Sequence, residues 1–269
     1  MLDDVPDAAE FSAWHADVHN SPACQLIFQQ ALGLPPEVVS NSLLTWAGVA
    51  EVTDALRLSP GQTLVDLACG RGGYGREVAR RTGARLLGFD FAAVAVTLAA
   101  RAGAGGAAPA GAAPAASAAP ARFCVGDFTA VGLRDRGADA VMCIDAVQFG
   151  EPPLAVLLEC RRILAEQGRL VVTAWEPIPP ADERLPQKTR RMNLTRDLAR
   201  AGFEQVTVTE MPRWADAERA LWEAALAGDA DGDPALASLQ REARTSLDTF
   251  DVKRRVFAVA TAPRCAIRI

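Results

Sequence analysis

A glycine-rich stretch, residues 64–75, holds the residue pattern with the clearest chemical potential in this sequence. Apolar residues at its start predict the end of a buried parallel strand, and the residues after the glycines predict the helix that follows. The glycines permit a tight turn whose free N–H groups face a ligand, which is typical of a nucleotide-like site. Gly70-x-Gly72-x-x-Gly75 also satisfies the dinucleotide-binding pattern, and Asp90 has the spacing of a ribose-binding acid.

Asp66, four residues before Gly70, distinguishes two kinds of cofactor. A dinucleotide would place an anionic pyrophosphate on this turn, where the Asp66 carboxylate repels it. S-adenosylmethionine has no phosphate. It carries a cationic sulfonium, a cationic ammonium and a carboxylate that the N–H groups of the turn can hold. An acid at the tip of the first strand therefore favours S-adenosylmethionine over a nicotinamide dinucleotide.

The segment Asp66-Leu-Ala-Cys-Gly70-Arg-Gly72 closely resembles the first motif of the class I S-adenosylmethionine-dependent methyltransferases. Ala68 is a departure, because that family usually has glycine at this position. Two further pieces occur in the order and spacing of the family: Asp90 at the tip of the second strand, and Gly126-Asp127-Phe128, which resembles its adenine-binding corner. The passage 162–172 looks like the helix, turn and strand that follow the fourth strand in the family.

The resemblance implies a set of cofactor-binding residues at and just after the ends of the first four strands: Asp66, Ala68, Cys69, Gly70, Gly72, Asp90, Phe91, Gly126, Asp127, Phe128 and Ile144. It implies that Asp90 binds the ribose hydroxyls, that Asp127 accepts a hydrogen bond from the adenine amine, and that the N–H of Phe128 meets a ring nitrogen. The alternative roles are structural: Asp66 and Asp90 as caps of strand ends, and Asp127 as part of an ordinary turn.

Candidates for contact with the substrate are His15, His19, Asp145, Gln148 and Glu176. Methyl transfer requires an aligned nucleophile and in some cases the removal of a proton. The two histidines share a face if their segment is helical, and a lid over the cofactor would bring either one to the substrate. Polar residues at the end of a surface helix are the alternative. The other three follow the fourth and fifth strands, at the edge where α/β folds bind ligands.

The elements that must position these residues alternate between strand and helix, which predicts a doubly wound, Rossmann-like α/β fold. The resemblance implies a mostly parallel seven-stranded sheet whose last strand is antiparallel. We expect a helical N-terminal extension or lid at 1–60, a cofactor-binding core at 61–177, and the rest of the sheet at 178–269. That last part contains a helical insertion at 211–250, before the last strand, that would cover the substrate.

Two segments add detail to this expectation. Apolar residues recur with a helical period across 37–56, which predicts a helix there in addition to helices at 10–20 and 23–32. Residues 102–121 are only Ala, Gly, Pro and Ser, which predicts a flexible surface insertion in the core.

Composition excludes several classes of partner. The net charge is −5 and no basic face is evident, so nucleic acid is not expected; no uncharged apolar run is long enough to span a membrane. The six cysteines have no metal-ligand spacing, so we expect no metal, and reduced, mostly buried thiols in a cytoplasmic protein. Only Lys188 and Lys253 among the 28 basic residues are lysine, which is typical of a GC-rich genome. The number of associated chains stays open, a homodimer included.

These observations predict transfer of a methyl group from S-adenosyl-L-methionine to a small-molecule acceptor, with S-adenosyl-L-homocysteine as the product. The expected setting is secondary metabolism, such as antibiotic biosynthesis. The absence of an Asn/Asp-Pro-Pro-aromatic motif after the fourth strand argues against nucleic-acid bases as acceptors. The alternatives are an NAD(P)-dependent oxidoreductase that uses the same turn, and a non-catalytic protein that binds S-adenosylmethionine. The sequence leaves an oxygen, nitrogen or carbon acceptor open.

Overall fold

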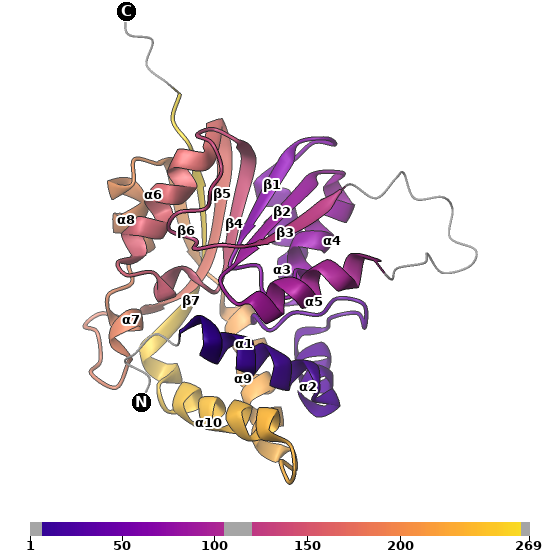
Figure 1. Cartoon of the computed structure of the whole chain (residues 1–269). Helices are drawn as coiled ribbons and strands as arrows, with labels where there is room; N and C mark the ends of the chain where they lie inside the picture. Colours follow the sequence, from indigo (N-terminus) through magenta and orange to yellow (C-terminus); the bar gives the residue numbers. More distant parts are fainter. Residues whose placement is uncertain (1–6, 105–119, 265–269) are drawn as a thin grey trace, which may run out of the picture.

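The computed structural model describes residues 7–104 and 120–264, which form one seven-stranded sheet with helices on both faces (Figure 1). The sheet order is β3-β2-β1-β4-β5-β7-β6. Most of the predicted insertion at 102–121 lies outside the described residues. Within the described ranges, no helix is long and apolar enough to cross a membrane.

Five strands are parallel neighbours: β1 (Thr63–Leu67), β2 (Arg85–Asp90), β3 (Ala121–Val125), β4 (Ala138–Ile144) and β5 (Leu164–Pro177). The last strand, β7 (Lys253–Thr261), is antiparallel both to β5 and to β6 (Glu204–Glu210). The mostly parallel sheet with an antiparallel last strand is therefore confirmed. Every β4 side chain except that of Asp139 is buried, because helices cover both faces of a central parallel strand.

Alternate strand residues pack against two separate hydrophobic clusters. Leu64 and Met142 belong to the first cluster, while Val65 and Cys143 belong to the second. The connecting helices are α4 (Gly73–Thr82), α5 (Ala93–Ala104), α6 (Pro153–Ile163), α7 (Gln187–Arg190) and α8 (Leu194–Arg200). Three of the five cysteines in the described ranges are buried, and all five are free thiols; Cys124 is exposed because β3 is an edge strand.

A second set of helices gathers at the carboxyl ends of the parallel strands (Figure 1). It comprises α1 (Ala8–His19) and α2 (Pro22–Leu32) from the N-terminal part, with α9 (Pro212–Ala227) and α10 (Pro234–Asp248) from the stretch before β7. Ser21 caps α2 and its hydroxyl lies 2.5 Å from Asp233, the residue that caps α10. The predicted pair of helices before the last strand is thus present, and it packs on the N-terminal helices.

The predicted helix over 37–56 is only partly correct. Helix α3 spans Trp46–Leu56, with Thr45 as its N-cap, while residues 37–45 form an irregular loop. The backbone of this loop makes tertiary hydrogen bonds in place of helical ones: the Leu43 N–H donates to Asp145 at 2.8 Å, and the Leu44 carbonyl accepts from the Tyr74 hydroxyl at 2.7 Å. An apolar period cannot reveal such distant partners, so the prediction placed the helix start too early.

Candidate active site

The glycine turn between β1 and α4 depends on unusual backbone conformations. Gly70 and Gly72 have φ values of 52° and 73°, in the left-handed region that favours glycine. Ala68 also lies there, with φ of 56°, which explains why the resembling family usually has glycine at this position. A Cβ on Gly75 would lie 2.5 Å from Asp66 Oδ2, so only glycine fits beside this carboxylate.

Two buried carboxylates lie beside the turn, near the ends of β1 and β2. Asp90, at the end of β2, accepts hydrogen bonds from the N–H groups of Gly70 at 2.8 Å and Ala92 at 2.9 Å. Asp66 is only 3% exposed, and its carboxylate accepts no hydrogen bond from the residues that the structure describes. Burial, and then the charge of Asp90, raise the pKa of Asp66 well above its usual value. This pair therefore favours a cation in the site.

An unpaired cation lies within the same turn. Arg71 is 7% exposed, and its guanidinium donates one hydrogen bond, of 2.7 Å, to the Asn41 side-chain oxygen. Its Nε and Nη1 atoms are buried without a partner, as is the Asn41 Nδ2, and no carboxylate in the described ranges forms an ion pair with it. Burial lowers the pKa of Arg71 to about 10. In the sequence, the position of Arg71 between two glycines of the turn could have indicated a role in binding, but Arg71 was not among the predicted site residues.

Helix α1 packs directly on this turn through His15. The His15 ring lies 3.5 Å from the point where a Cβ on Gly70 would stand, and its buried Nδ1 has no partner. Burial, and then the charge of Arg71, lower the pKa of His15 to about 4, so the ring is neutral near pH 7. His19 is exposed at the far end of the helix, so the two histidines do not share one environment.

Aromatic rings extend this cover across two strand tips. The Phe11 ring of α1 lies 5.1 Å from that of Phe91, after β2, and 5.6 Å from that of Phe149, after β4. Trp14 packs edge-on against His15 at 5.0 Å. Helix α1 therefore covers the carboxyl ends of the strands, where we expected a lid.

The remaining predicted cofactor residues follow β3 and β4. The Gly126 N–H donates to the Asp90 carbonyl at 3.0 Å, which joins the two strand ends. Asp127 is exposed, and its Oδ1 accepts from both the N–H and the hydroxyl of Thr129 at 2.7 Å, so one carboxylate oxygen remains for a ligand. Phe128 is half-buried, and Ile144 is buried at the end of β4. The half-exposed Cys69 lies in the turn itself, and burial of its thiol raises its pKa.

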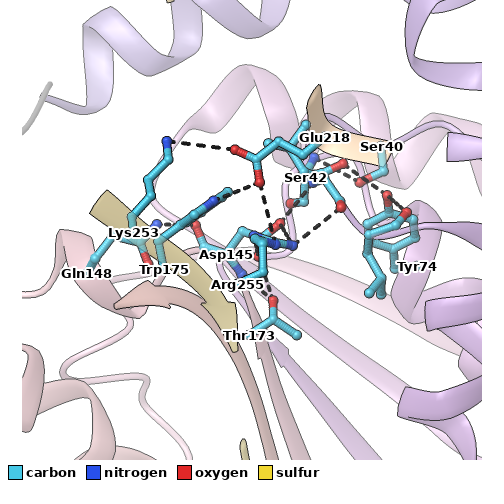
Figure 2. Close-up of polar contacts among 12 residues, drawn as sticks. Ser40, Ser42, Tyr74, Asp145, Gln148, Thr173, Trp175, Glu218, Lys253 and Arg255 are labelled. Carbon is cyan, nitrogen blue, oxygen red and sulfur yellow. Dashed lines mark hydrogen bonds and ion pairs between the residues drawn. The ribbon is translucent and has the colours of Figure 1, made fainter. Parts of the chain in front are cut away.

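Asp145, at the tip of β4, is the centre of a buried network (Figure 2). Its carboxylate accepts two hydrogen bonds from Arg255, at 2.7 and 3.2 Å, one from the Thr173 hydroxyl at 2.6 Å, and the Leu43 N–H described above. Arg255 is 1% exposed and lies 4.1 Å from the centre of the Trp175 ring. The Asp145 carboxylate is thus saturated with donors, and it positions its neighbours.

Gln148 and Glu176 have different surroundings. The Gln148 amide nitrogen donates to the Asp145 carbonyl at 2.7 Å, while its buried Oε1 has no partner. Glu176 accepts from the Leu194 N–H at 2.5 Å and from Arg254 at 2.9 Å, so both of its oxygens are engaged in holding α8 and β7. Of the five predicted substrate contacts, His15 and Gln148 keep a free polar atom inside the site.

A buried acid that the sequence analysis missed lies beside Arg255. Glu218 of α9 is 1% exposed and accepts hydrogen bonds from the indole N–H groups of Trp175 at 2.8 Å and Trp222 at 3.1 Å. Lys253 and Arg255 lie 3.8 and 3.7 Å from its oxygens (Figure 2). In the described part of the chain, no group of three or more His, Cys, Asp or Glu side chains has a metal-binding arrangement.

The sequence matches a family model described as a methyltransferase domain over residues 65–172. A sterol 24-C-methyltransferase of Gibberella zeae is 30% identical over 118 residues, which are 44% of this chain and 29% of that protein. The chain therefore spans less than a third of the length of this relative.

Among solved structures, the [4+2]-cyclase SpnF superposes with a TM-score of 0.74 at 19% identity, covering 97% of this chain and 98% of that one. The geranyl diphosphate C-methyltransferase of Streptomyces coelicolor superposes with a TM-score of 0.65 at 14% identity, covering 90% and 99%. These likenesses concern the fold. Residues 65–172 thus match a methyltransferase domain, and the chain shares the fold of these solved structures.

Proposed function

We propose that this protein transfers a methyl group from S-adenosylmethionine to a small-molecule acceptor. The observation that carries the proposal is the charge pattern of the glycine turn within the matched methyltransferase domain. The turn has an unpaired buried cation, Arg71, and a pair of buried acids, Asp66 and Asp90. The amino-acid end of S-adenosylmethionine carries a carboxylate and an ammonium, so each charge meets its opposite. The cofactor, when bound, supplies an activated methyl group on a sulfonium.

Each part of the cofactor has residues suited to hold it. Arg71 has two unpartnered nitrogens, Nε and Nη1, on different edges of its guanidinium, so one of them can donate to the carboxylate, and the free Asn41 amide nitrogen can add a second hydrogen bond. Asp66 attracts the ammonium. Asp90 binds the ribose hydroxyls, in addition to its hydrogen bond to the turn. Asp127 binds the adenine amine through the oxygen that Thr129 leaves free.

Helix α1 would close the site and exclude water. Phe11 and Trp14 supply apolar cover over the strand tips, and His15 is a neutral polar group against the turn. Exclusion of water favours transfer, because a nucleophile must lose its hydration before it attacks. On this basis residues 1–60 act as a lid domain, 61–177 hold the cofactor, and the helices within 211–250 border the acceptor.

The acceptor would be a product of secondary metabolism. The sterol and geranyl diphosphate methyltransferases that this chain resembles are named for small lipophilic substrates. In this chain, Phe149 follows β4 and packs on Phe11, and Trp175 lies near the end of β5 beside Arg255, so aromatic rings near the ends of both strands suit an apolar scaffold.

Calorimetry with S-adenosylhomocysteine and NADH, followed by mass spectrometry of reactions with S-adenosylmethionine, tests the proposal. We expect binding of the first ligand alone, and the gain of one methyl group by an acceptor from a panel of hydroxylated, amino and carbon-acid compounds. The fold is shared with a [4+2]-cyclase, so the second measurement is essential. Tight cofactor binding without methylation of any acceptor would contradict the proposal and leave a non-catalytic S-adenosylmethionine-binding protein.

A further inference from the structure

Lysine is rare in this chain, and both lysines contribute to one cluster. Among 28 basic residues only Lys188 and Lys253 are lysine. The acid Glu242 of α10 interacts electrostatically with both of them, and Lys253 also pairs with Glu218. An arginine keeps its proton at any ordinary pH, whereas a lysine amine can lose and regain one. A chain that uses arginine nearly everywhere else thus has its two exchangeable ammonium groups at a single place.

Lys253 begins β7, opposite Pro177 of β5, at the edge of the sheet that carries the candidate site. Its side chain is 12% exposed, and Nζ lies 3.8 Å from Glu218, beyond hydrogen-bond distance. Aromatic faces lie to the sides, with ring centres 6.0 Å away at Trp175 and 5.8 Å away at Phe250. Among the described residues, Nζ has no hydrogen-bond partner, so its bonding capacity is open to a ligand.

The groups that face Lys253 come from three elements. Glu218 of α9 and Glu242 of α10 favour the ammonium form, while Arg255 of β7 opposes it. Burial is the largest influence, and it lowers the pKa of Lys253 below the ordinary lysine value of 10.5. Glu218 is held in place by two indole N–H groups, so it can stabilise the charge that Lys253 would gain with a proton.

Two more features lie at the same edge. Gln148 has a buried carbonyl oxygen without a donor, although its amide nitrogen is fixed by the Asp145 carbonyl. Lys188 of α7 lies with its Nζ 4.7 Å from the centre of the Phe149 ring. The cluster thus borders three aromatic rings, those of Phe149, Trp175 and Phe250. A planar ring that carries one polar hydrogen donor would match this arrangement.

We propose that Lys253 is a catalytic base and that the acceptor is a phenol or an enol. This inference rests on the proposed methyl transfer and names its substrate class. The O–H bond of the acceptor breaks and its proton passes to the Lys253 amine, which becomes an ammonium paired with Glu218. The oxygen keeps the electron pair, which forms the new bond to the methyl carbon as the bond from that carbon to sulfur breaks. Before the proton moves to Lys253, the free Gln148 oxygen can accept a hydrogen bond from the hydroxyl group of the substrate.

The acidity of the hydroxyl group favours phenols and enols over other classes of acceptor. A phenol has a pKa of about 10, close to that of lysine, and proton transfer is efficient between groups of similar pKa. An aliphatic hydroxyl is far less acidic than a lysine ammonium. An amine attacks with its own lone pair and needs no base before the transfer.

The scarcity of lysine makes a direct measurement possible. Protein labelled with ¹³C,¹⁵N-lysine should give two side-chain signals that correlate the ε-methylene with Nζ, and Lys188→Arg assigns them. We expect Lys253 to titrate below the ordinary lysine value in the free protein. With S-adenosylhomocysteine bound, phenol should shift Lys253 toward its charged form, while anisole, which lacks the acidic proton, should not. A titration of Lys253 at or above the ordinary value, or no response to phenol, would overturn the proposal.

Kinetics with a phenolic acceptor gives the second readout. Lys253→Arg keeps the charge near Glu218 but cannot accept a proton, so we expect a loss of about 10²-fold or more in kcat. A purely structural cation would be rescued by arginine. Arg219→Lys is the matched control, because Arg219 is an exposed cation over the same Phe250 ring, and its exchange should change turnover little. If S-adenosylhomocysteine does not bind at all, the proposed function fails, but the titration of Lys253 in the free protein still stands.

Discussion

Replacing Arg71 by methionine should have opposite effects on ligand binding and on stability. Methionine keeps much of the length of the side chain and removes the charge. In the free protein, burial lowers the pKa of Arg71 from the ordinary arginine value to about 10, so the surroundings disfavour the charged form by roughly 3 kcal/mol. Loss of the hydrogen bond to Asn41 would offset about 1 kcal/mol of the stability gained by removing the buried charge. We therefore expect the ligand-free variant to be more stable than the wild type by about 1–2 kcal/mol.

The same change should weaken cofactor binding. The unpartnered Nε and Nη1 atoms lie on different edges of the guanidinium, so one of them can donate to the carboxylate, and such a charge-assisted bond contributes about 1.5–3 kcal/mol. A loss of about 10- to 150-fold in Kd therefore follows for S-adenosylhomocysteine. The ligand 5′-methylthioadenosine has the same adenine and ribose but no amino-acid end, so its affinity should not change.

Calorimetry with both ligands, and denaturant unfolding of the free protein, check these expectations. Equal losses of affinity for the two ligands would mean that Arg71 only shapes the turn. An unchanged affinity for S-adenosylhomocysteine would refute the assignment of the carboxylate to Arg71. A less stable free variant would show that the guanidinium is satisfied by the fold, contrary to its two unpartnered N–H groups.

Further outcomes follow from the same site. Asp90→Asn should weaken binding of S-adenosylhomocysteine by about 1–3 kcal/mol, measured by calorimetry, and a wild-type affinity would remove Asp90 from the ribose site. Ala68→Gly should stabilise the fold by about 0.5–1 kcal/mol in denaturant unfolding, because φ of 56° suits glycine, whereas the control Ala100→Gly in α5 should destabilise it by about 1 kcal/mol. Between pH 6.5 and about 4, His15 binds fewer protons in the folded protein than in the unfolded chain, so the free energy of unfolding should fall as the pH drops through this window. The fall should be smaller in His15→Phe, and an equal fall in both proteins would exclude His15 as the cause. Deletion of residues 1–20, which removes α1, should abolish turnover with a far smaller loss of cofactor affinity, and near-normal turnover would disprove the lid.

Local pattern was sufficient for most of the fold. The stretch 138–144, apolar except for Asp139, and the break at 228–234 predicted β4 and the two-helix insertion, because burial and helix breaking act through neighbouring residues. The loop 37–45 was mistaken for helix because its backbone bonds to Asp145 and Tyr74, which are distant in sequence.

The candidate site was predictable only where one segment carries the chemistry. The glycine turn and Asp90 have a fixed spacing, so the sequence singled them out. Glu218 and Lys253 meet only because α9 packs beside the start of β7. Conversely, Glu176 was a plausible site residue from its position, yet its oxygens hold Leu194 and Arg254. Sequence position identifies the edge of a sheet but does not reveal which side chains the fold has already engaged.

The bonds of Arg255 also bear on how the protein is made. Its side chain joins Asp145, 110 residues earlier, to the carbonyl of Leu43, 212 residues earlier. During synthesis, these three parts can meet only after Arg255 has left the ribosome. Until then Asp145, at the tip of β4, lacks its counterion, and the N-terminal loop is held only by its bonds to Asp145 and Tyr74. Assembly of the acceptor side is thereby delayed until β7 emerges, and a prematurely terminated chain would have the glycine turn but no completed site.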